Sequence, residues 1–301
     1  MKIPYKKFKF GVQTMVIISR ANTIVDEYLA KGFRLTLRQL YYQFVSRGLS
    51  ENTTQAYKRI GSIINDGRLA GLIDWDAIED RTREMTRNAH WNSPKEIVES
   101  CAQQFRIDKW KPQEYRPEVW IEKEALAGLV DGICRELDIP YLSCRGYTSQ
   151  SEMWSSAMRM KSHLLAGQQP LIIHLGDHDP SGIDMTRDIE DRLGMFVGMA
   201  GDVELRRIAL NMDQIESYNP PPNPAKVTDS RYADYAKKYG DESWELDALD
   251  PSIIVDMIRG EVEAVMNEDK WEESIETENE GKKQLEQAAK KMKTKTTKET
   301  V

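Results

Sequence analysis

Two short acidic segments follow apolar runs and could bind a divalent metal ion. In VWIEKEAL an apolar run ends at Glu122, and in LIIHLGDHDPSG another ends at Asp177 and Asp179. Residues two apart on an extended backbone point to the same side, so Asp177 and Asp179 present paired carboxylates, whereas His178 points away and is expected to be structural. Carboxylates with water in the remaining positions suit Mg²⁺, which could assist phosphodiester cleavage. An isolated pair of this kind is often a turn or helix cap, and the second acidic segment favours a metal site.

A tyrosine beside an arginine is the second candidate for chemistry. In LTLRQLYYQFVSRG the apolar stripe of a helix comprises Leu37, Leu40, Tyr41, Phe44 and Val45. Tyr42 lies outside that stripe and shares a face with Arg38, four residues earlier. An exposed phenol beside a guanidinium could attack a phosphodiester, because the cation favours phenolate and stabilises the developing charge. Alternatively, Tyr42 packs at the rim of the core or touches a phosphate.

The charge of the chain is divided unequally. Lys and Arg number 42 against 49 Asp and Glu, but residues 1–68 hold 12 basic and 4 acidic residues. This basic region attracts phosphate. Its patterns predict helices at 11–31, 36–47 and 52–65, followed by a β-hairpin within 67–78, which together describe a winged helix-turn-helix. The expected DNA contacts are Gln55, Lys58, Arg59 and Arg68. Many helix-turn-helix units bind only protein, which is the alternative.

The rest of the chain alternates short apolar strands with amphipathic helices, and this pattern predicts a mainly parallel sheet covered by helices. We expect strands at 119–121, 141–144, 171–175 and 203–210. Helices are expected at 124–137, 150–165, 181–193 and 251–266, and an irregular loop at 219–231. The predicted domains are a winged helix-turn-helix over 1–87, an irregular linker over 88–117, the α/β domain over 118–266 and a charged tail over 267–301. The tail is expected to be a solvated helix or disordered.

The composition excludes several classes of protein. Hydrophobic residues make up 40% of the chain and charged residues 30%, as in globular proteins. The longest apolar stretches fall far short of the roughly 20 residues that cross a bilayer, and the basic N-terminus lacks a cleavage pattern. We therefore expect a cytoplasmic protein that does not bind membrane. Cys101, Cys134 and Cys144 are far apart, which argues against a zinc finger or a disulfide scaffold.

These segments together resemble a known combination of domains. VWIEKEAL and LGDHDPSG resemble the Glu and Asp-x-Asp motifs of Toprim domains, whose metal-binding carboxylates correspond to Glu122, Asp177 and Asp179. RQLYY resembles the R-x-x-Y-Y motif in the winged-helix domain of the topoisomerase VI A subunit and its meiotic double-strand-break relatives. In that family the second tyrosine is the nucleophile, which corresponds to Tyr42. CRGYTSQ and WELDAL also resemble segments of the family, and the similarity covers roughly residues 36–265.

The resemblance implies a symmetric homodimer in which the tyrosine of one protomer works with the metal site of the other. It also implies reversible cleavage of double-stranded DNA that leaves a 5′-phosphotyrosyl end. No Gly-rich ATP site is present in the sequence, so ATP-gated strand passage would need a separate ATPase subunit.

We therefore expect an α/β protein, a winged helix-turn-helix followed by a Toprim domain, that cleaves DNA with Mg²⁺ or Mn²⁺. Tyr42 attacks the phosphate and Arg38 assists. Glu122, Asp177 and Asp179 hold the metal, and Glu122 also moves a proton to or from the leaving 3′-hydroxyl. One alternative is a Toprim endonuclease that uses metal-activated water and does not need Tyr42. Another is a non-catalytic DNA-binding adaptor with a vestigial metal site.

Overall fold

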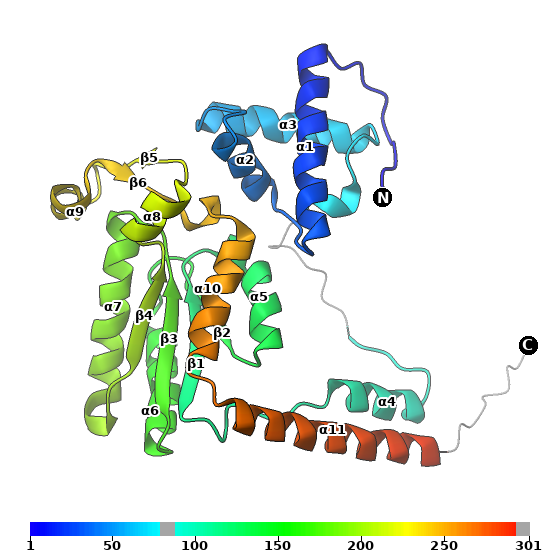
Figure 1. Cartoon of the computed structure of the whole chain (residues 1–301), viewed down its shortest axis with the longest axis vertical. Helices are drawn as coiled ribbons and strands as arrows, with labels where there is room; N and C mark the ends of the chain where they lie inside the picture. Colours follow the sequence, from blue (N-terminus) through cyan, green and yellow to red (C-terminus); the bar gives the residue numbers. More distant parts are fainter. Residues whose placement is uncertain (79–87, 293–301) are drawn as a thin grey trace, which may run out of the picture.

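The structure is a computed structural model that describes residues 1–78 and 88–292. These residues form a helical N-terminal module, an α/β module and a pair of helices that projects from the α/β module as an arm (Figure 1). The strands of the sheet run with their carboxyl ends toward the N-terminal module, as Figure 1 shows. Residues that follow each strand therefore face that module.

Three helices make up the N-terminal module: α1 (Val12–Ala30), α2 (Leu37–Ser46) and α3 (Thr54–Leu69). A capping box starts α2, because the Thr36 hydroxyl accepts from the Gln39 backbone amide and the Gln39 side chain accepts from the Thr36 amide. The apolar faces of the helices pack into one core around Leu40 and Phe44. The expected helices are confirmed, and α3 continues to Leu69.

The β-hairpin expected within 67–78 is wrong in the part of the chain that the structure describes. Helix α3 runs through Gly67, and a one-turn 3-10 helix, η1 (Trp75–Ala77), follows. Gly67 permits close packing, since a Cβ at this position would lie 3.0 Å from Cδ1 of Ile73. The glycine that suggested a turn therefore serves helix packing instead.

The α/β module contains a four-stranded parallel sheet. Its strands are β1 (Tyr115–Ile121), β2 (Tyr141–Ser143), β3 (Gln169–Leu175) and β4 (Glu204–Ala209), in the order β2-β1-β3-β4. The parallel sheet confirms the expected α/β class, because each parallel connection needs a crossover that here contains a helix.

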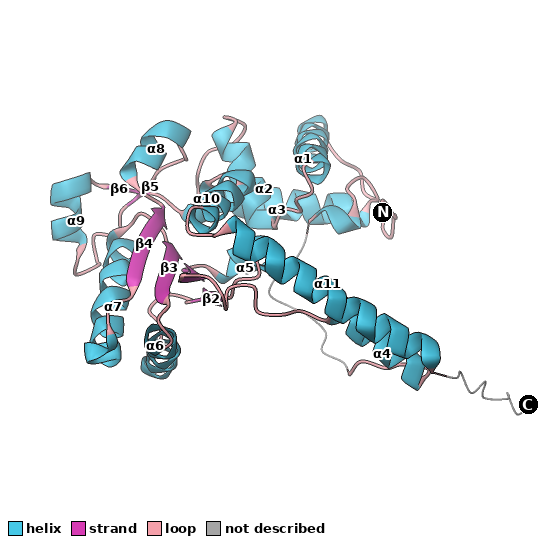
Figure 2. Ribbon diagram, turned by 60° about the horizontal axis from the view of Figure 1, so that its bottom comes forward, coloured by secondary structure: helices cyan, strands magenta, loops and turns pink. Residues whose placement is uncertain are grey.

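Helices cover both faces of this sheet (Figures 1 and 2). They are α5 (Ala127–Glu136), α6 (Gln150–Leu165), α7 (Pro180–Val197) and α10 (Pro251–Glu263), with a short η2 (Glu124–Leu126) leading into α5. Alternate strand residues serve alternate faces: Val119 and Ile121 join the core with α5 and α10, and Trp120 joins the core with α6 and α7. Each face is thereby sealed by its own apolar cluster.

A smaller group of elements lies at the carboxyl edge of the sheet. It comprises α8 (Met212–Tyr218), β5 (Asn223–Pro224), α9 (Tyr232–Tyr239), β6 (Glu242–Ser243) and η4 (Leu246–Ala248). A further short helix, η3 (Gly198–Ala200), follows α7 at the opposite edge of the sheet, before β4. Strands β5 and β6 pair in antiparallel fashion, so the loop expected at 219–231 contains one very short strand. Helix α2 packs against η4, which joins the two modules.

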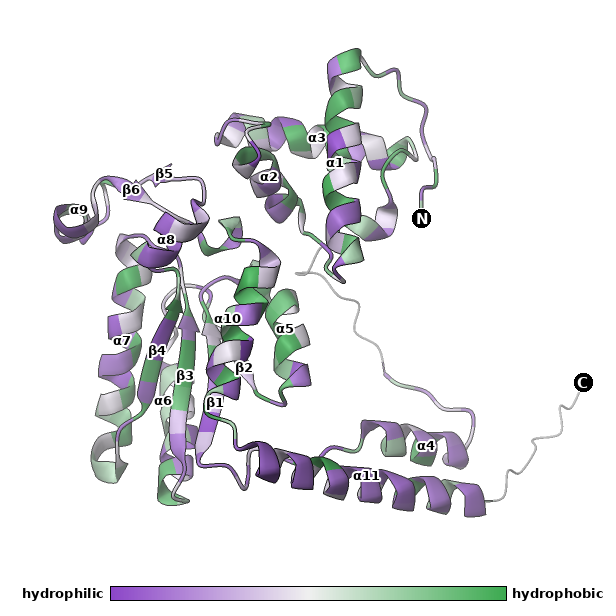
Figure 3. Cartoon of the chain, in the orientation of Figure 1, coloured by the Kyte–Doolittle hydropathy of each residue, from purple (hydrophilic) through white to green (hydrophobic). Residues whose placement is uncertain are grey.

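The arm consists of α4 (Pro94–Gln104) and α11 (Glu268–Lys291), which pack side by side (Figures 1 and 2). Its surface is mostly hydrophilic, as Figure 3 shows. The linker over 88–117 is therefore not irregular throughout, and the tail is helical through Lys291. Its remaining residues, 293–301, lie outside the described part of the chain. Within residues 1–78 and 88–292, none of the helices has the length and apolar character that crossing a membrane requires.

Candidate active site

Glu122 and Asp177 meet at the carboxyl edge of the sheet. Strands β1 and β3 are parallel neighbours whose last residues, Ile121 and Leu175, are in register. Glu122 follows the first strand, and its Oε2 accepts a hydrogen bond of 2.8 Å from the Asp177 backbone amide. This edge is the position at which open α/β sheets bind ligands. The expected convergence of these two segments is confirmed.

Two glycines make room for the Glu122 carboxylate. A Cβ at Gly176 would lie 3.1 Å from Oε2 of Glu122, and a Cβ at Gly182 would lie 3.2 Å from the same oxygen. At Gly182 it would also collide with the carbonyl oxygen of Asp177. The glycines thus allow the carboxylate to lie directly against the backbone between β3 and α7.

Asp179 lies beside this pair and caps α7. Its Oδ1 accepts from the Gly182 backbone amide at 2.6 Å and from the Ser181 hydroxyl at 2.8 Å. This is the N-cap arrangement, which satisfies backbone amides at the start of the helix. Asp179 is therefore a helix cap, which is a common role for aspartate in such segments. It also lies close enough to Glu122 to raise the pKa of that residue.

The carboxyl groups of Glu122 and Asp177 lie in surroundings that disfavour negative charge. Burial, and then the charges of Asp177 and Asp179, raise the pKa of Glu122 to about 7. Burial likewise raises the pKa of Asp177 to about 6, although Lys123 opposes this shift. Strongly shifted acids in a recess are typical of functional sites. A cation or a proton would relieve the repulsion between them.

Lys123 links this acidic pair to a second one, formed by Glu245 and Asp247 at η4. Its Nζ lies 3.0 Å from Oδ2 of Asp177, 2.7 Å from Oε2 of Glu245 and 3.1 Å from Oδ1 of Asp247. Burial opposes the charge of Lys123, but the three carboxylates outweigh it and raise the lysine pKa. Lys123 is thus held charged at the centre of the site.

Arg38, on α2 of the N-terminal module, also binds Glu245 and Asp247. Its Nε lies 2.9 Å from Oδ2 of Asp247, and its Nη2 pairs with Glu245. Nη2 also donates to the Tyr42 hydroxyl at 3.4 Å. A continuous set of contacts therefore leads from Tyr42 through Arg38, the second acidic pair and Lys123 to Asp177.

Tyr42 is placed by the structure at the boundary of the two modules, but it is not exposed as the sequence suggested. Only 4% of its surface is accessible to solvent. Burial, followed by the charges of Asp247 and Glu245, raises the pKa of Tyr42 to about 12, and Arg38 opposes this shift only in part. In this state the phenol is neutral, so activation requires a change in its surroundings.

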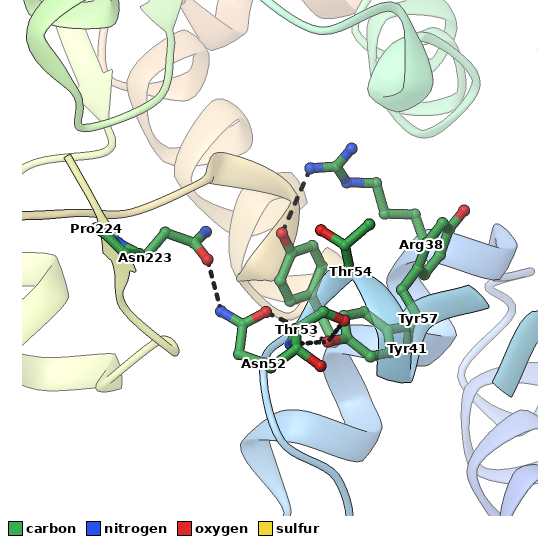
Figure 4. Close-up of a pocket in the computed structure, with 9 residues that line it drawn as sticks. Arg38, Tyr41, Asn52, Thr53, Thr54, Tyr57, Asn223 and Pro224 are labelled. Atoms are coloured by element: carbon green, nitrogen blue, oxygen red, sulfur yellow. Dashed lines mark hydrogen bonds between the residues drawn. The ribbon is translucent and has the colours of Figure 1, made fainter. Parts of the chain in front are cut away.

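A cavity of about 480 Å³ opens beside Tyr42 (Figure 4). It lies between the N-terminal module and β5, and its walls include Arg38, Tyr41, Tyr42, Asn52, Thr53, Thr54, Tyr57, Asn223 and Pro224. The two walls are joined by a hydrogen bond of 2.8 Å from the Asn52 amide to Oδ1 of Asn223. Pockets of this size between modules commonly bind small molecules or parts of larger ones.

The four residues expected to contact DNA differ in their exposure to solvent. Gln55, Lys58 and Arg59 are exposed on α3, as predicted from the helical pattern. Arg68 is instead half-buried, where it donates to the carbonyls of Trp75 at 2.6 Å and Ile78 at 3.2 Å. Its guanidinium holds the segment after α3 in place.

Sequence reasoning missed four residues of the site: Lys123, Arg207, Glu245 and Asp247. Arg207 is half-buried under the β3–α7 turn and donates to the carbonyls of Gly176 and Asp177. Two signals were available, since Lys123 lies inside EKEA and the second acidic pair lies inside WELDAL. His178 is buried, and its Nδ1 lies 2.8 Å from the Tyr235 hydroxyl, which confirms its structural role.

The donor chemistry of Glu122 and Asp177 fits a divalent cation, because both are hard oxygen ligands whose negative charge lacks full compensation. Among the described residues, however, no three His, Cys, Asp or Glu side chains are arranged to hold a metal ion. Asp179 is engaged by the backbone of α7, and Lys123 already contacts Asp177. Both oxygens of the Asp177 carboxylate are engaged, Oδ1 by the Leu246 backbone amide at 2.8 Å and Oδ2 by Lys123. A bound ion would therefore have to displace Lys123 from Asp177, and Asp179 would have to leave its cap.

Comparison with known proteins does not identify the chain. Neither protein-family models nor the sequences of curated proteins match it. Its function must accordingly be argued from the site itself.

Proposed function

We propose that this chain is a magnesium-dependent DNA-cleaving protein of the topoisomerase VI A type, in which Tyr42 forms a covalent link to DNA. The observation that supports this most is the set of contacts from Tyr42 through Arg38 and Lys123 to Asp177. A nucleophile, two cations and clustered carboxylates are the groups that phosphoryl transfer needs. The proposal includes a Toprim identity for the α/β module and a helix-turn-helix identity for the N-terminal module, which their sequence motifs suggest, although the hairpin expected as its wing within 67–78 is replaced by α3 and η1.

In the proposed reaction the Tyr42 oxygen attacks phosphorus and forms a new P–O bond. The phenol gives up its proton to water as it attacks. The bond from phosphorus to the 3′-oxygen breaks, and that oxygen receives a proton from Glu122 and leaves as a hydroxyl, so that one proton is lost and one is gained. Arg38 stabilises the negative charge on the phosphate oxygens, because its guanidinium can form two parallel hydrogen bonds to them. Glu122, with its pKa of about 7, is suited to hold or release the proton.

Glu122 and Asp177 would hold the metal ion. Bound Mg²⁺ supplies stabilisation of the developing negative charge at the reacting phosphate. Lys123 keeps the remaining carboxylates neutralised, so that the anionic DNA backbone can approach this acidic edge. Without such cations the five clustered carboxylates would repel it.

Hydrolysis is the second candidate, and the state of Tyr42 favours it. The tyrosine is buried and its pKa is raised to about 12, whereas Glu122 has the pKa expected of a general base near neutral pH. In this alternative the same carboxylates activate water, and the tyrosine contributes only to packing.

One experiment separates these proposals. The full chain is incubated with end-labelled duplex and Mg²⁺ or Mn²⁺, denatured, and examined for label attached to protein. An adduct that disappears in Tyr42→Phe supports covalent cleavage. Free cleavage that survives Tyr42→Phe but not Asp177→Ala supports hydrolysis. Binding without cleavage supports a non-catalytic adaptor and contradicts both enzymatic proposals.

The proposal also includes two protein partners. A second copy of the chain would complete a symmetric dimer, and a separate subunit would supply ATP hydrolysis for strand passage. Light scattering of the purified chain, alone and with duplex, tests the first: a mass of 34.7 kDa for the free protein, together with a complex that holds one chain per duplex, contradicts the dimer.

A further inference from the structure

The cavity beside Tyr42 has aromatic residues in its wall. Tyr57 lines it and stacks edge-on against Tyr41, with ring centroids 5.3 Å apart and an interplanar angle of 70°. Nucleobases stack favourably on aromatic side chains of this kind. The volume of about 480 Å³ is sufficient for a nucleoside, since pockets for small organic ligands begin near 300 Å³.

Polar groups with unused hydrogen-bonding capacity lie around this wall. Within residues 1–78 and 88–292, no hydrogen bond is formed by the hydroxyl of Thr54 or that of Tyr57, both of which line the cavity. Asn223 uses its Oδ1 to accept from Asn52, which leaves its amide nitrogen available. Hydroxyl and amide groups of this kind can bind base edges and sugar oxygens.

Groups suited to phosphate flank the same cavity. Arg38 uses Nε and Nη2 for its contacts with Asp247, Glu245 and Tyr42, whereas its Nη1 has no partner among the described residues. Thr53 and Thr54 form the start of the 16-residue helix α3, and a helix N-terminus favours negative charge. Figure 4 shows Arg38 and the two threonines around one recess.

We propose that this cavity binds one unstacked nucleoside of the DNA strand, next to the phosphate that Tyr42 attacks. The inference rests on the proposed DNA-cleaving function and specifies its substrate: DNA that is locally unpaired or easily unstacked at the cleavage position. The base stacks on Tyr57, Thr54 and Asn223 bind its polar edge, and Arg38 binds the adjoining phosphate. Removal of a base from the helix costs free energy, and this cost is smallest where the base is already unpaired.

A binding experiment without metal tests this inference. The full chain in EDTA is titrated into a fluorescein-labelled 24-base-pair duplex and into the same duplex with one extra, unpaired nucleotide at its centre. We expect at least tenfold tighter binding of the bulged duplex. Thr54→Val and Tyr57→Leu should reduce this preference to less than threefold while leaving the affinity for the paired duplex within threefold.

Tyr218→Leu is the matched control, because Tyr218 is an exposed tyrosine at the end of α8 outside the cavity. It should keep the full preference. Thr54→Val is nearly isosteric at an exposed position, so it separates a binding effect from loss of folding, which thermal unfolding checks.

Equal binding of both duplexes, or a preference that neither cavity variant changes, overturns the inference. A bulge preference without any covalent adduct in Mg²⁺ contradicts only the cleavage proposal. An adduct without a bulge preference contradicts only the nucleoside pocket. Absence of DNA binding contradicts both.

Discussion

The ammonium nitrogen of Lys123 lies 3.0 Å from Oδ2 of Asp177, so the chain itself neutralises one carboxylate of the candidate site. The same nitrogen contacts Glu245 and Asp247, of which Asp247 is almost fully buried. Lys123 is therefore the common partner of carboxylates from two distant segments of sequence. Removal of its charge should affect the stability of the fold as well as any chemistry at the site.

We expect Lys123→Met to destabilise the protein by about 3 kcal/mol, because it removes the cation paired with Asp177 and leaves Glu245 and Asp247 to Arg38. Part of this loss should be recovered by Mg²⁺, which can bind the freed carboxylates. Urea unfolding with and without 10 mM MgCl₂ measures both effects. Lys111→Met is the control, since Lys111 is exposed and outside the site. A variant as stable as the control would contradict the central role of Lys123.

Binding of Mg²⁺ should stabilise the wild-type fold through Glu122 and Asp177. A ligand that binds only the folded state at a concentration 100 times its Kd contributes about 2.7 kcal/mol. We expect MgCl₂ at pH 8 to raise the Tm of the wild type but not that of Glu122→Gln or Asp177→Asn. Glu273→Gln, on the exposed face of α11, should respond like the wild type. An equal rise in all four proteins would place the ion elsewhere.

Much of the α/β module could be predicted because its strands are short apolar runs. Residues 115–118 of β1 were not predicted, and they show the limit of prediction from apolar runs. Glu118 is buried within the strand and accepts from Arg159 of α6 at 2.7 Å, so a charged residue occupies an interior position. Nothing in the local pattern indicates this distant partner. The predicted strand consequently begins too late.

Helix α4 was missed although its start has a recognisable pattern. Ser93 accepts from the Glu96 backbone amide, and Pro94 occupies the first turn, where its lack of an amide proton costs nothing. Proline was interpreted as a sign of irregular structure, whereas here it marks a helix N-terminus. The packing of α4 on α11 further stabilises it, and that contact joins residues far apart in sequence.

The candidate site was predictable only where sheet geometry determines it. Glu122 and Asp177 follow neighbouring parallel strands, so their proximity follows from the topology. The positions of Glu245 and Asp247 depend on how the chain folds back after β6, which no periodic pattern specifies. The burial of Tyr42 likewise results from docking of the two modules and not from the pattern of its own helix.

Protonation of Glu122 should contribute stability to the metal-free protein as the pH falls from 8 to 5.5, in opposition to the buried His174 and His178, whose pKa values are lowered. Glu122 has a pKa of about 7 when folded, against an ordinary value of 4.5, so the folded chain binds this proton more tightly than the unfolded chain. Lowering the pH through 7 therefore favours folding, by on the order of 2 kcal/mol. Urea unfolding in EDTA should show the free energy of unfolding of the wild type gaining on that of Glu122→Gln by this amount between pH 8 and 5.5, because the histidine contributions are common to both proteins. Identical pH profiles would contradict the raised pKa.

Arg38 and Asp247 should be energetically coupled across the two modules. Their contact of 2.9 Å joins a half-exposed guanidinium to a buried carboxylate, so solvent screens it only in part. We expect a coupling energy of about 1 kcal/mol or more from Arg38→Ala, Asp247→Ala and the double variant. The exposed pair of Arg259 and Glu136 is the control and should give about 0.5 kcal/mol or less. Equal coupling in both cycles would argue against a specific link between the modules.

The exposed and half-buried cations of the N-terminal module should behave differently toward DNA. Lys58→Gln and Arg59→Gln should each lower the slope of log affinity against log salt by about 1, because each removes one phosphate contact. Arg68→Gln should leave that slope unchanged and destabilise the fold by about 1–3 kcal/mol, because two carbonyls lose their donor. Titrations between 50 and 200 mM NaCl, with urea unfolding of each variant, distinguish the two effects. A lower slope in a fully stable Arg68→Gln variant would instead place Arg68 at the DNA, and it would require the segment after α3 to move away from its guanidinium on binding.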